Sequence, residues 1–268
     1  MLKYIYFVNK CFMNCLKKVK SGYLKDKKAF TLAEVLITLA IIGVVAALTV
    51  PTLQKNYRAL QFKAGFKKAY AETGQLAKYM QLDYGSEDLY SALGTANSGG
   101  SNESIAYGFA KSVESYYKSI KNNPKRYLYN KILDKNGKEI IYKNHTKTTP
   151  LIAGMFDDGG FELLDGRVII FEGGFGSRPF MITYDINGMN SGPNAWGYDL
   201  FSFVLAPNGL FYPAGSPVLK DLINEAKMDE HFCEHTSGCS KTSKSNCNGI
   251  SCANEAVKNH NYFNELKF

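Results

Sequence analysis

The chain has 268 residues, of which 45% are hydrophobic and 21% charged, a composition that excludes a disordered, collagen-like or multi-span membrane protein. Its net charge of +8 is of the kind found in proteins that bind nucleic acid. However, residues 1–29 hold eight lysines and one acidic residue, so the rest of the chain is close to neutral. This distribution disfavours a nucleic-acid-binding face and places the basic charge ahead of an apolar run, where it holds that end in the cytoplasm.

The apolar run covers residues 30–50 and contains one charged residue, Glu34. As a helix it would be about 31 Å long, which matches a hydrocarbon core of about 30 Å, and it has no polar stripe. We therefore predict a transmembrane helix. A cleaved secretory signal is one alternative, but the run ends without a clear small-residue cleavage site. A plain signal anchor is another, but it leaves the cost of an intramembrane carboxylate unexplained.

A specific resemblance lies at the start of this run. Residues 27–34, Lys-Lys-Ala-Phe-Thr-Leu-Ala-Glu, resemble the processing motif of type IV pilins and type II secretion pseudopilins, and the resemblance continues through Gly43 to Pro51. It implies that a prepilin peptidase cuts between Ala29 and Phe30 and methylates the new amino terminus. The family usually has Gly before the cut, so Ala29 predicts slower cleavage. The leader of 29 residues is long, and Met13 is an alternative start.

The resemblance also implies how such a chain assembles. The helices of residues 30–50 would leave the membrane for the core of a filament, where Glu34 would pair with the terminal amine of Phe30 from a neighbouring subunit. The implied partners are other pilin or pseudopilin subunits, the prepilin peptidase and an inner-membrane assembly platform. The chain would be a single-pass protein of the inner (cytoplasmic) membrane, with a cytoplasmic N-terminus and an extracytoplasmic head.

Helical periodicity continues beyond Pro51. Apolar residues recur at spacings of three and four from Phe62 to Met80, which predicts an amphipathic helix that packs on a sheet. Shorter helices are predicted over 105–120 and 217–230.

Strand patterns follow at 161–164, 167–171, 180–186, 200–206 and 210–212, with turn signals at Asp165-Gly166 and Pro207-Asn208-Gly209. The expected fold class is α+β and pilin-like: a long N-terminal helix, transmembrane in its first half, packed on an antiparallel sheet, with a disulfide-bearing C-terminal region. The expected segments are a leader (1–29), a transmembrane helix (30–50), the amphipathic half of that helix (51–82) and a head (83–268).

Four cysteines gather near the C-terminal end: Cys233, Cys239, Cys247 and Cys252. An even set in an exported segment predicts two disulfides, with three connectivities left open. The alternative is a zinc site that includes His231 and His235, but it lacks a paired Cys-x-x-Cys element.

The loop between two predicted strands alternates oxygen-bearing side chains with glycines. Its candidate ligands are Asp185, Asn187, Asn190, Asn194 and Asp199. Calcium prefers carboxylate and amide oxygens, so this loop is a candidate calcium site and calcium is the one cofactor considered. The alternative is a rigid turn loop, because Asp, Asn and Gly are common turn residues.

These observations favour a structural subunit of a type IV pilus-like filament, either a type II secretion pseudopilin or a minor pilin, and not an enzyme. The sequence contains no H-E-x-x-H, G-x-S-x-G or G-x-x-x-x-G-K pattern. The alternatives are a pilus-tip adhesin or DNA-uptake pilin and, third, a membrane-anchored extracytoplasmic enzyme.

Overall fold

The computed structural model describes residues 31–84, 109–110, 112–117, 139–151, 159–173, 179–227 and 238–267. The chain divides into two compact units, Met1–Thr52 and Leu53–Phe268. The predicted leader and the predicted cleavage site at Ala29 and Phe30 lie outside the described residues.

The longest element is helix α2, which spans Leu32–Tyr84 and so ends two residues later than predicted. Pro51 lies inside it, as expected, since neighbouring hydrogen bonds maintain a helix across a single proline. Within the described part of the chain, α2 is the one helix long and apolar enough to cross a membrane, and none of its most apolar window is buried in the structure.

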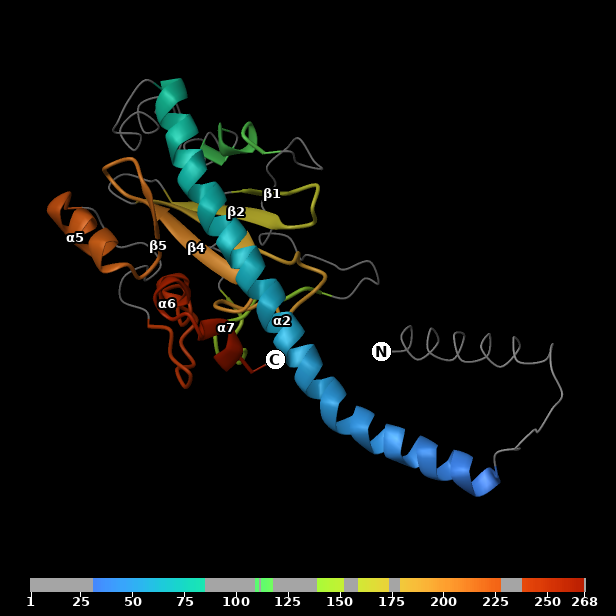
Figure 1. Cartoon of the computed structure of the whole chain (residues 1–268). Helices are drawn as coiled ribbons and strands as arrows, with labels where there is room; N and C mark the ends of the chain where they lie inside the picture. The colour runs from blue at the N-terminus through green and yellow to red at the C-terminus, as the bar shows by residue number, and fades with distance from the viewer. Residues whose placement is uncertain are drawn as a thin grey trace. The chain divides into compact units, whose positions relative to one another are not determined.

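In the second unit, α2 lies across a five-stranded sheet (Figure 1). The strands are β1 (Gly160–Glu162), β2 (Val168–Gly173), β3 (Phe180–Asp185), β4 (Leu200–Leu205) and β5 (Phe211–Pro213). They follow one another in sequence order, and each pair is antiparallel. The predicted meander, and with it the α+β pilin-like layout, is confirmed.

Tight turns set the register of the two outer hairpins. At the first, Leu163 N–H donates to the Arg167 carbonyl at 2.8 Å, and Gly166 has a φ of 86° that favours glycine. At the second, Ala206 N–H donates to the Leu210 carbonyl at 2.9 Å. Both turns form where the sequence places Asp165-Gly166 and Pro207-Asn208-Gly209.

Both faces of the sheet are covered, which explains why every residue of β3 and β4 is buried. One face packs against the buried side of α2: Ala59, Phe62, Phe66, Ala69, Thr73, Leu76, Ala77 and Met80. The other face packs against Leu219 and Ile223 of helix α5 (Pro217–Glu225), and against Trp196. Helices α6 (Cys252–Lys258) and α7 (Tyr262–Glu265) contribute side chains to the α2 side.

Two helices end earlier than the sequence predicts. Helix α5 ends at Glu225 rather than at 230, because Lys227 takes a left-handed φ of 52°, which stops a helix. Of the helix predicted over 105–120, residues 109–110 and 112–114 are helical, and a turn follows at 115–117. There Tyr116 and Tyr117 bond to carbonyls three residues back, and this tighter pattern commonly closes a helix.

Candidate functional site

The first turn of α2 carries a reciprocal pair of hydrogen bonds between Thr31 and Glu34. The backbone N–H of Thr31 donates to Glu34 Oε2 at 2.8 Å, and the Thr31 hydroxyl donates to the same oxygen at 2.9 Å. In return, Glu34 N–H donates to Thr31 Oγ1 at 3.2 Å. This arrangement is a capping box, which satisfies backbone donors at a helix start. Its Thr-x-x-Glu signature is present in the sequence at Thr31 and Glu34.

The capping box fixes where the Glu34 carboxylate lies. Both Thr31 donors end on Oε2, and no cationic side chain of the described residues forms an ion pair with Glu34. A negative side chain is also favoured in the first turn of a helix by the helix dipole. Glu34 is therefore held in place by its own chain, and the two Thr31 donors of the capping box do not use its Oε1.

The loop between β3 and β4 brings Asp185 and Asp199 into one buried cluster. Asp185 Oδ1 accepts from the N–H groups of Asn187 and Gly188 at 3.3 and 2.8 Å, and its Oδ2 accepts from the Tyr142 hydroxyl at 2.9 Å. Both aspartates are fully buried. Tyr142 was not among the predicted ligands, because it is 43 residues away from Asp185 in the chain.

Asp199 organises the other end of the same loop. Its two oxygens accept from the N–H groups of Asn194 and Ala195 at 2.8 and 2.7 Å. The amide nitrogens of Asn187 and Asn194 donate to the carbonyls of Gly192 and Met189. Much of the loop is thus the hydrogen-bonded turn structure named as the alternative to calcium.

Two features of the loop remain unexplained by turn structure. Burial raises the pKa of both Asp185 and Asp199, and the charge of Asp199 raises that of Asp185 further. In addition, Asn187 Oδ1 and Asn194 Oδ1 are buried oxygens without a hydrogen-bond partner in the described structure. Close carboxylates with spare amide oxygens match the donor chemistry of a hard cation. Asn190 is exposed and does not join this cluster.

The C-terminal cysteines confirm that this region carries disulfides. Cys239 and Cys252 are bonded to each other, and Cys247 is also disulfide-bonded. Zinc needs free thiolates, so the Cys239 and Cys252 sulfurs are not available to it, although the buried His145 lies beside them. Cys233, His231 and His235 lie outside the described residues.

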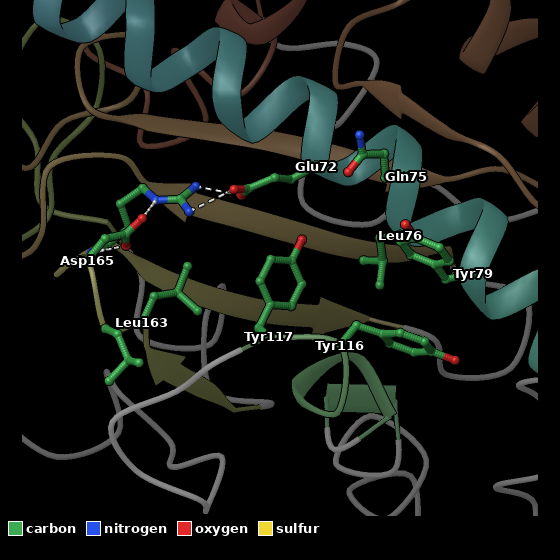
Figure 2. Close-up of a pocket in the computed structure, with 10 residues that line it drawn as sticks. Glu72, Gln75, Leu76, Tyr79, Tyr116, Tyr117, Leu163 and Asp165 are labelled. Carbon is green, nitrogen blue, oxygen red and sulfur yellow. Dashed lines mark hydrogen bonds and ion pairs between the residues drawn. The ribbon is translucent and has the colours of Figure 1, made fainter.

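A pocket of about 310 Å³ lies between α2, residues 116–117 and the β1–β2 turn (Figure 2). Its charged groups are occupied with one another: the Arg167 guanidinium donates to both oxygens of Glu72 at 2.7 and 3.0 Å and to Asp165 Oδ2 at 2.8 Å. Tyr117 shares a 2.7 Å hydrogen bond with Tyr184. These groups are arranged as a structural clamp, and none is placed as a free acid or base.

Comparison with known proteins gives one match. Residues 24–50 match the model described as the prokaryotic N-terminal methylation motif. No curated protein and no solved structure matches the chain. The matched segment contains Ala29, Phe30 and Glu34. Of these three residues, Glu34 lies within the described part of the chain, in the first turn of α2.

Proposed function

We propose that this chain, which carries the type IV pilin-like methylation signal and a pilin-like layout, is a structural subunit of a pilus-like filament. Its finer role would be that of a type II secretion pseudopilin or a minor pilin. The observation that carries the proposal is the coincidence of three features at one place. The methylation motif, an apolar helix with no buried side chain in its apolar window and a carboxylate in the first turn of that helix all fall within residues 24–50.

Cleavage before Phe30 would create a cation for Glu34, which forms no ion pair with any residue that the structure describes. The new terminal amine of Phe30 is a cation four residues before Glu34 in the same chain. In the filament core, the amine of a neighbouring Phe30 would instead approach the Oε1 that the capping box leaves free. Losing one member of a buried ion pair costs about 3–5 kcal/mol, so this pairing would select the correct register between subunits.

The remaining partners follow from the same proposal. A prepilin peptidase would process the chain, and an inner-membrane assembly platform would move it into the filament with other pilin-like subunits. The lysines of residues 1–29 would keep the N-terminus cytoplasmic, with the head on the opposite side of the membrane.

The first test is the N-terminal sequence and mass of the membrane-extracted protein, produced with and without a prepilin peptidase. We expect a mature chain that begins at Phe30 and is heavier by one methyl group, about 14 Da. An uncut chain, or one cut beyond Val50, would contradict the filament role.

A matched set of variants then tests the charge of Glu34. Glu34→Gln keeps a capping-box residue but removes the charge, whereas Thr31→Ala removes the cap and keeps the charge. We expect Glu34→Gln to be processed but to fail in assembly, and Thr31→Ala to assemble. Sedimentation of sheared filaments measures the assembled fraction, and normal assembly of Glu34→Gln would refute charge pairing.

We also propose that the β3–β4 loop binds calcium through Asp185 and Asp199, with the amide oxygens of Asn187 and Asn194. The support is the pair of buried carboxylates with raised pKa values and the two buried amide oxygens without partners in the described structure. A bound cation would offset the mutual repulsion of the carboxylates, and its contribution would be to fix the loop.

Calcium should raise the melting temperature of the head, whereas a rise in pH should lower it. A carboxyl with a raised pKa stabilises the folded state at low pH and loses that contribution as pH rises above about 4, so without calcium the melting temperature should fall between pH 5 and 8. Calcium at 100 times its dissociation constant should restore about 2.7 kcal/mol. Trp196, the single tryptophan, reports unfolding by fluorescence.

A pair of variants tests whether Asp185 binds the calcium. Asp185→Asn should abolish the increase in melting temperature that calcium causes. The control Asp221→Asn, at an exposed position, should keep that increase. An unchanged increase in Asp185→Asn would exclude this site.

A further inference from the structure

The walls of the pocket in Figure 2 contain more than ion pairs. Besides three charged residues, the described lining includes three leucines, one glutamine and three tyrosines, Tyr79, Tyr116 and Tyr117. The volume of about 310 Å³ lies at the lower end of the range for small-molecule sites, about 300–1,000 Å³. Such sites combine mainly apolar and aromatic walls with a few polar groups, and this pocket has that composition.

The charges at the pocket cancel one another, which favours a neutral ligand. Arg167 forms ion pairs with Glu72 and Asp165, and Lys68 approaches Asp165 from outside the pocket, so two cations face two carboxylates. An anionic ligand would need a cation that is not already paired, and the described lining residues offer none. The carboxylate oxygens still have lone pairs that can accept hydrogen bonds from hydroxyl groups.

The tyrosines supply flat surfaces that are held in position. The rings of Tyr79 and Tyr116 are nearly parallel, with an interplanar angle of 8° and centroids 6.4 Å apart. The hydroxyl of Tyr116 donates to Asp83, and the hydroxyl of Tyr117 is bonded to that of Tyr184. Two of the three rings are thus fixed before a ligand binds, and a preformed site loses less entropy on binding.

The pocket places hydrogen-bonding groups and aromatic rings on different sides. Figure 2 shows the Glu72 carboxylate on one side of the Tyr117 ring and the rings of Tyr79 and Tyr116 on the other. Tyr79 is 55% exposed, and Gln75, one turn earlier in α2, is also exposed. A ligand would therefore meet acceptors on one side, aromatic rings on the other, and an amide at the rim.

We infer that this pocket binds a neutral sugar residue of a carbohydrate. A sugar ring carries C–H groups on its faces and hydroxyl groups around its edge, so it can pack on tyrosine rings while its hydroxyls bond to carboxylates and to the Gln75 amide. A purely apolar ligand would cover the same carboxylates without bonding to them, which is unfavourable. The inference does not depend on the filament role, because the pocket uses residues 72–79 of α2, well after the apolar run that ends at Val50.

A glycan array tests the class of ligand. The full-length chain is purified in a detergent without a sugar headgroup, so that the detergent does not compete, and is applied to an array of neutral and acidic glycans. We expect binding to neutral glycans. Binding to acidic glycans only, or to no neutral glycan, would overturn the inference.

Substitutions of exposed tyrosines on α2 test the location of the site. Tyr79→Ala removes a ring from the pocket and should weaken binding of the neutral glycans about tenfold or more, whereas Tyr79→Phe keeps the ring and should retain binding. The matched control is Tyr57→Ala, at a position that is 63% exposed on the same helix and outside the pocket, and it should bind like the unaltered chain.

The melting temperatures of these variants separate lost binding from lost folding. Because both tyrosines are more than half exposed, all three variants should melt close to the unaltered chain. Unchanged glycan binding by Tyr79→Ala, or an equal loss in Tyr57→Ala, would show that this pocket does not hold the sugar.

Discussion

Arg167 connects the β1–β2 turn to helix α2. Its side chain is only 8% exposed and forms ion pairs with Glu72 and Asp165. The fork of the guanidinium matches the two oxygens of Glu72 in a way that a lysine ammonium cannot. Lys68 approaches the same Asp165 oxygen at 2.8 Å, but its side chain is 53% exposed, so solvent screens that contact.

Arg167→Lys should therefore destabilise the head by about 2 kcal/mol, below the 3–5 kcal/mol of a fully buried pair because the Glu72 carboxylate is 25% exposed. Lys68→Ala should cost less than about 1 kcal/mol. Urea unfolding of the detergent-purified chain measures both. Equal costs for the two variants would mean that the clamp is not held by the buried guanidinium.

At the scale of elements, helix α2 shows how one continuous helix meets several environments. Residues 35–50 present apolar side chains that the structure leaves exposed, whereas Phe66 packs among Phe201, Phe203 and Phe263 with ring centroids 4.7 to 6.2 Å apart. Proline at position 51 is compatible with this because it removes one hydrogen bond and keeps a helical φ.

The two faces of α2 should respond differently to truncation. Phe66→Ala should destabilise the head by about 3–5 kcal/mol, because it leaves a cavity among buried aromatic rings. Leu60→Ala, at an exposed position of the same helix, should change the stability of the unassembled chain by less than about 0.5 kcal/mol. Thermal unfolding in detergent measures both, and a large cost for Leu60→Ala would place that residue in the core instead of on the exposed face of the helix.

At the scale of the whole molecule, a disulfide closes a loop within the C-terminal segment, which packs on the head. The Cys239–Cys252 bond closes a separation of 13 residues, and a closed loop of that length contributes about 3 kcal/mol. Cys252 starts helix α6, and its neighbour Ala253 is buried in the core. The disulfide thus fixes the loop of residues 239–251 to the start of a short helix that could not persist alone, while Ala253 anchors that helix in the core.

Peptide mapping without reduction should recover Cys239 joined to Cys252. If the four cysteines form two disulfides, the remaining pair is Cys233 with Cys247, one of the three connectivities that the sequence left open. Replacing both Cys239 and Cys252 by Ala should lower the unfolding free energy by about 3 kcal/mol. A peptide that joins Cys239 to Cys233 or to Cys247 would contradict the pairing.

The amino-acid sequence by itself determined the features that depend on neighbouring residues. Length and apolarity predicted the segment of α2 up to Val50, the motif at residues 27–34 predicted the methylation signal, and the Asp165-Gly166 turn predicted the first hairpin. These predictions succeed because helix periodicity, turn geometry and motif spacing depend on residues that are close together in the sequence. Even locally, the end of α5 was missed, since a left-handed Lys227 is not the glycine that usually marks a helix stop.

Only the tertiary structure decided which distant groups meet. Arg167 forms an ion pair with Glu72, 95 residues away in the chain, and the Tyr142 hydroxyl donates a hydrogen bond to Asp185. No spacing in the sequence predicts either contact. Five oxygen ligands in the β3–β4 loop were predicted from the sequence. In the structure the Asp185 and Asp199 carboxylates are buried together, whereas Asn190 is exposed. Such contacts form only when the sheet, the helix and the loops pack together. The loss of conformational entropy on folding is offset by packing over the whole head and not by any local pattern.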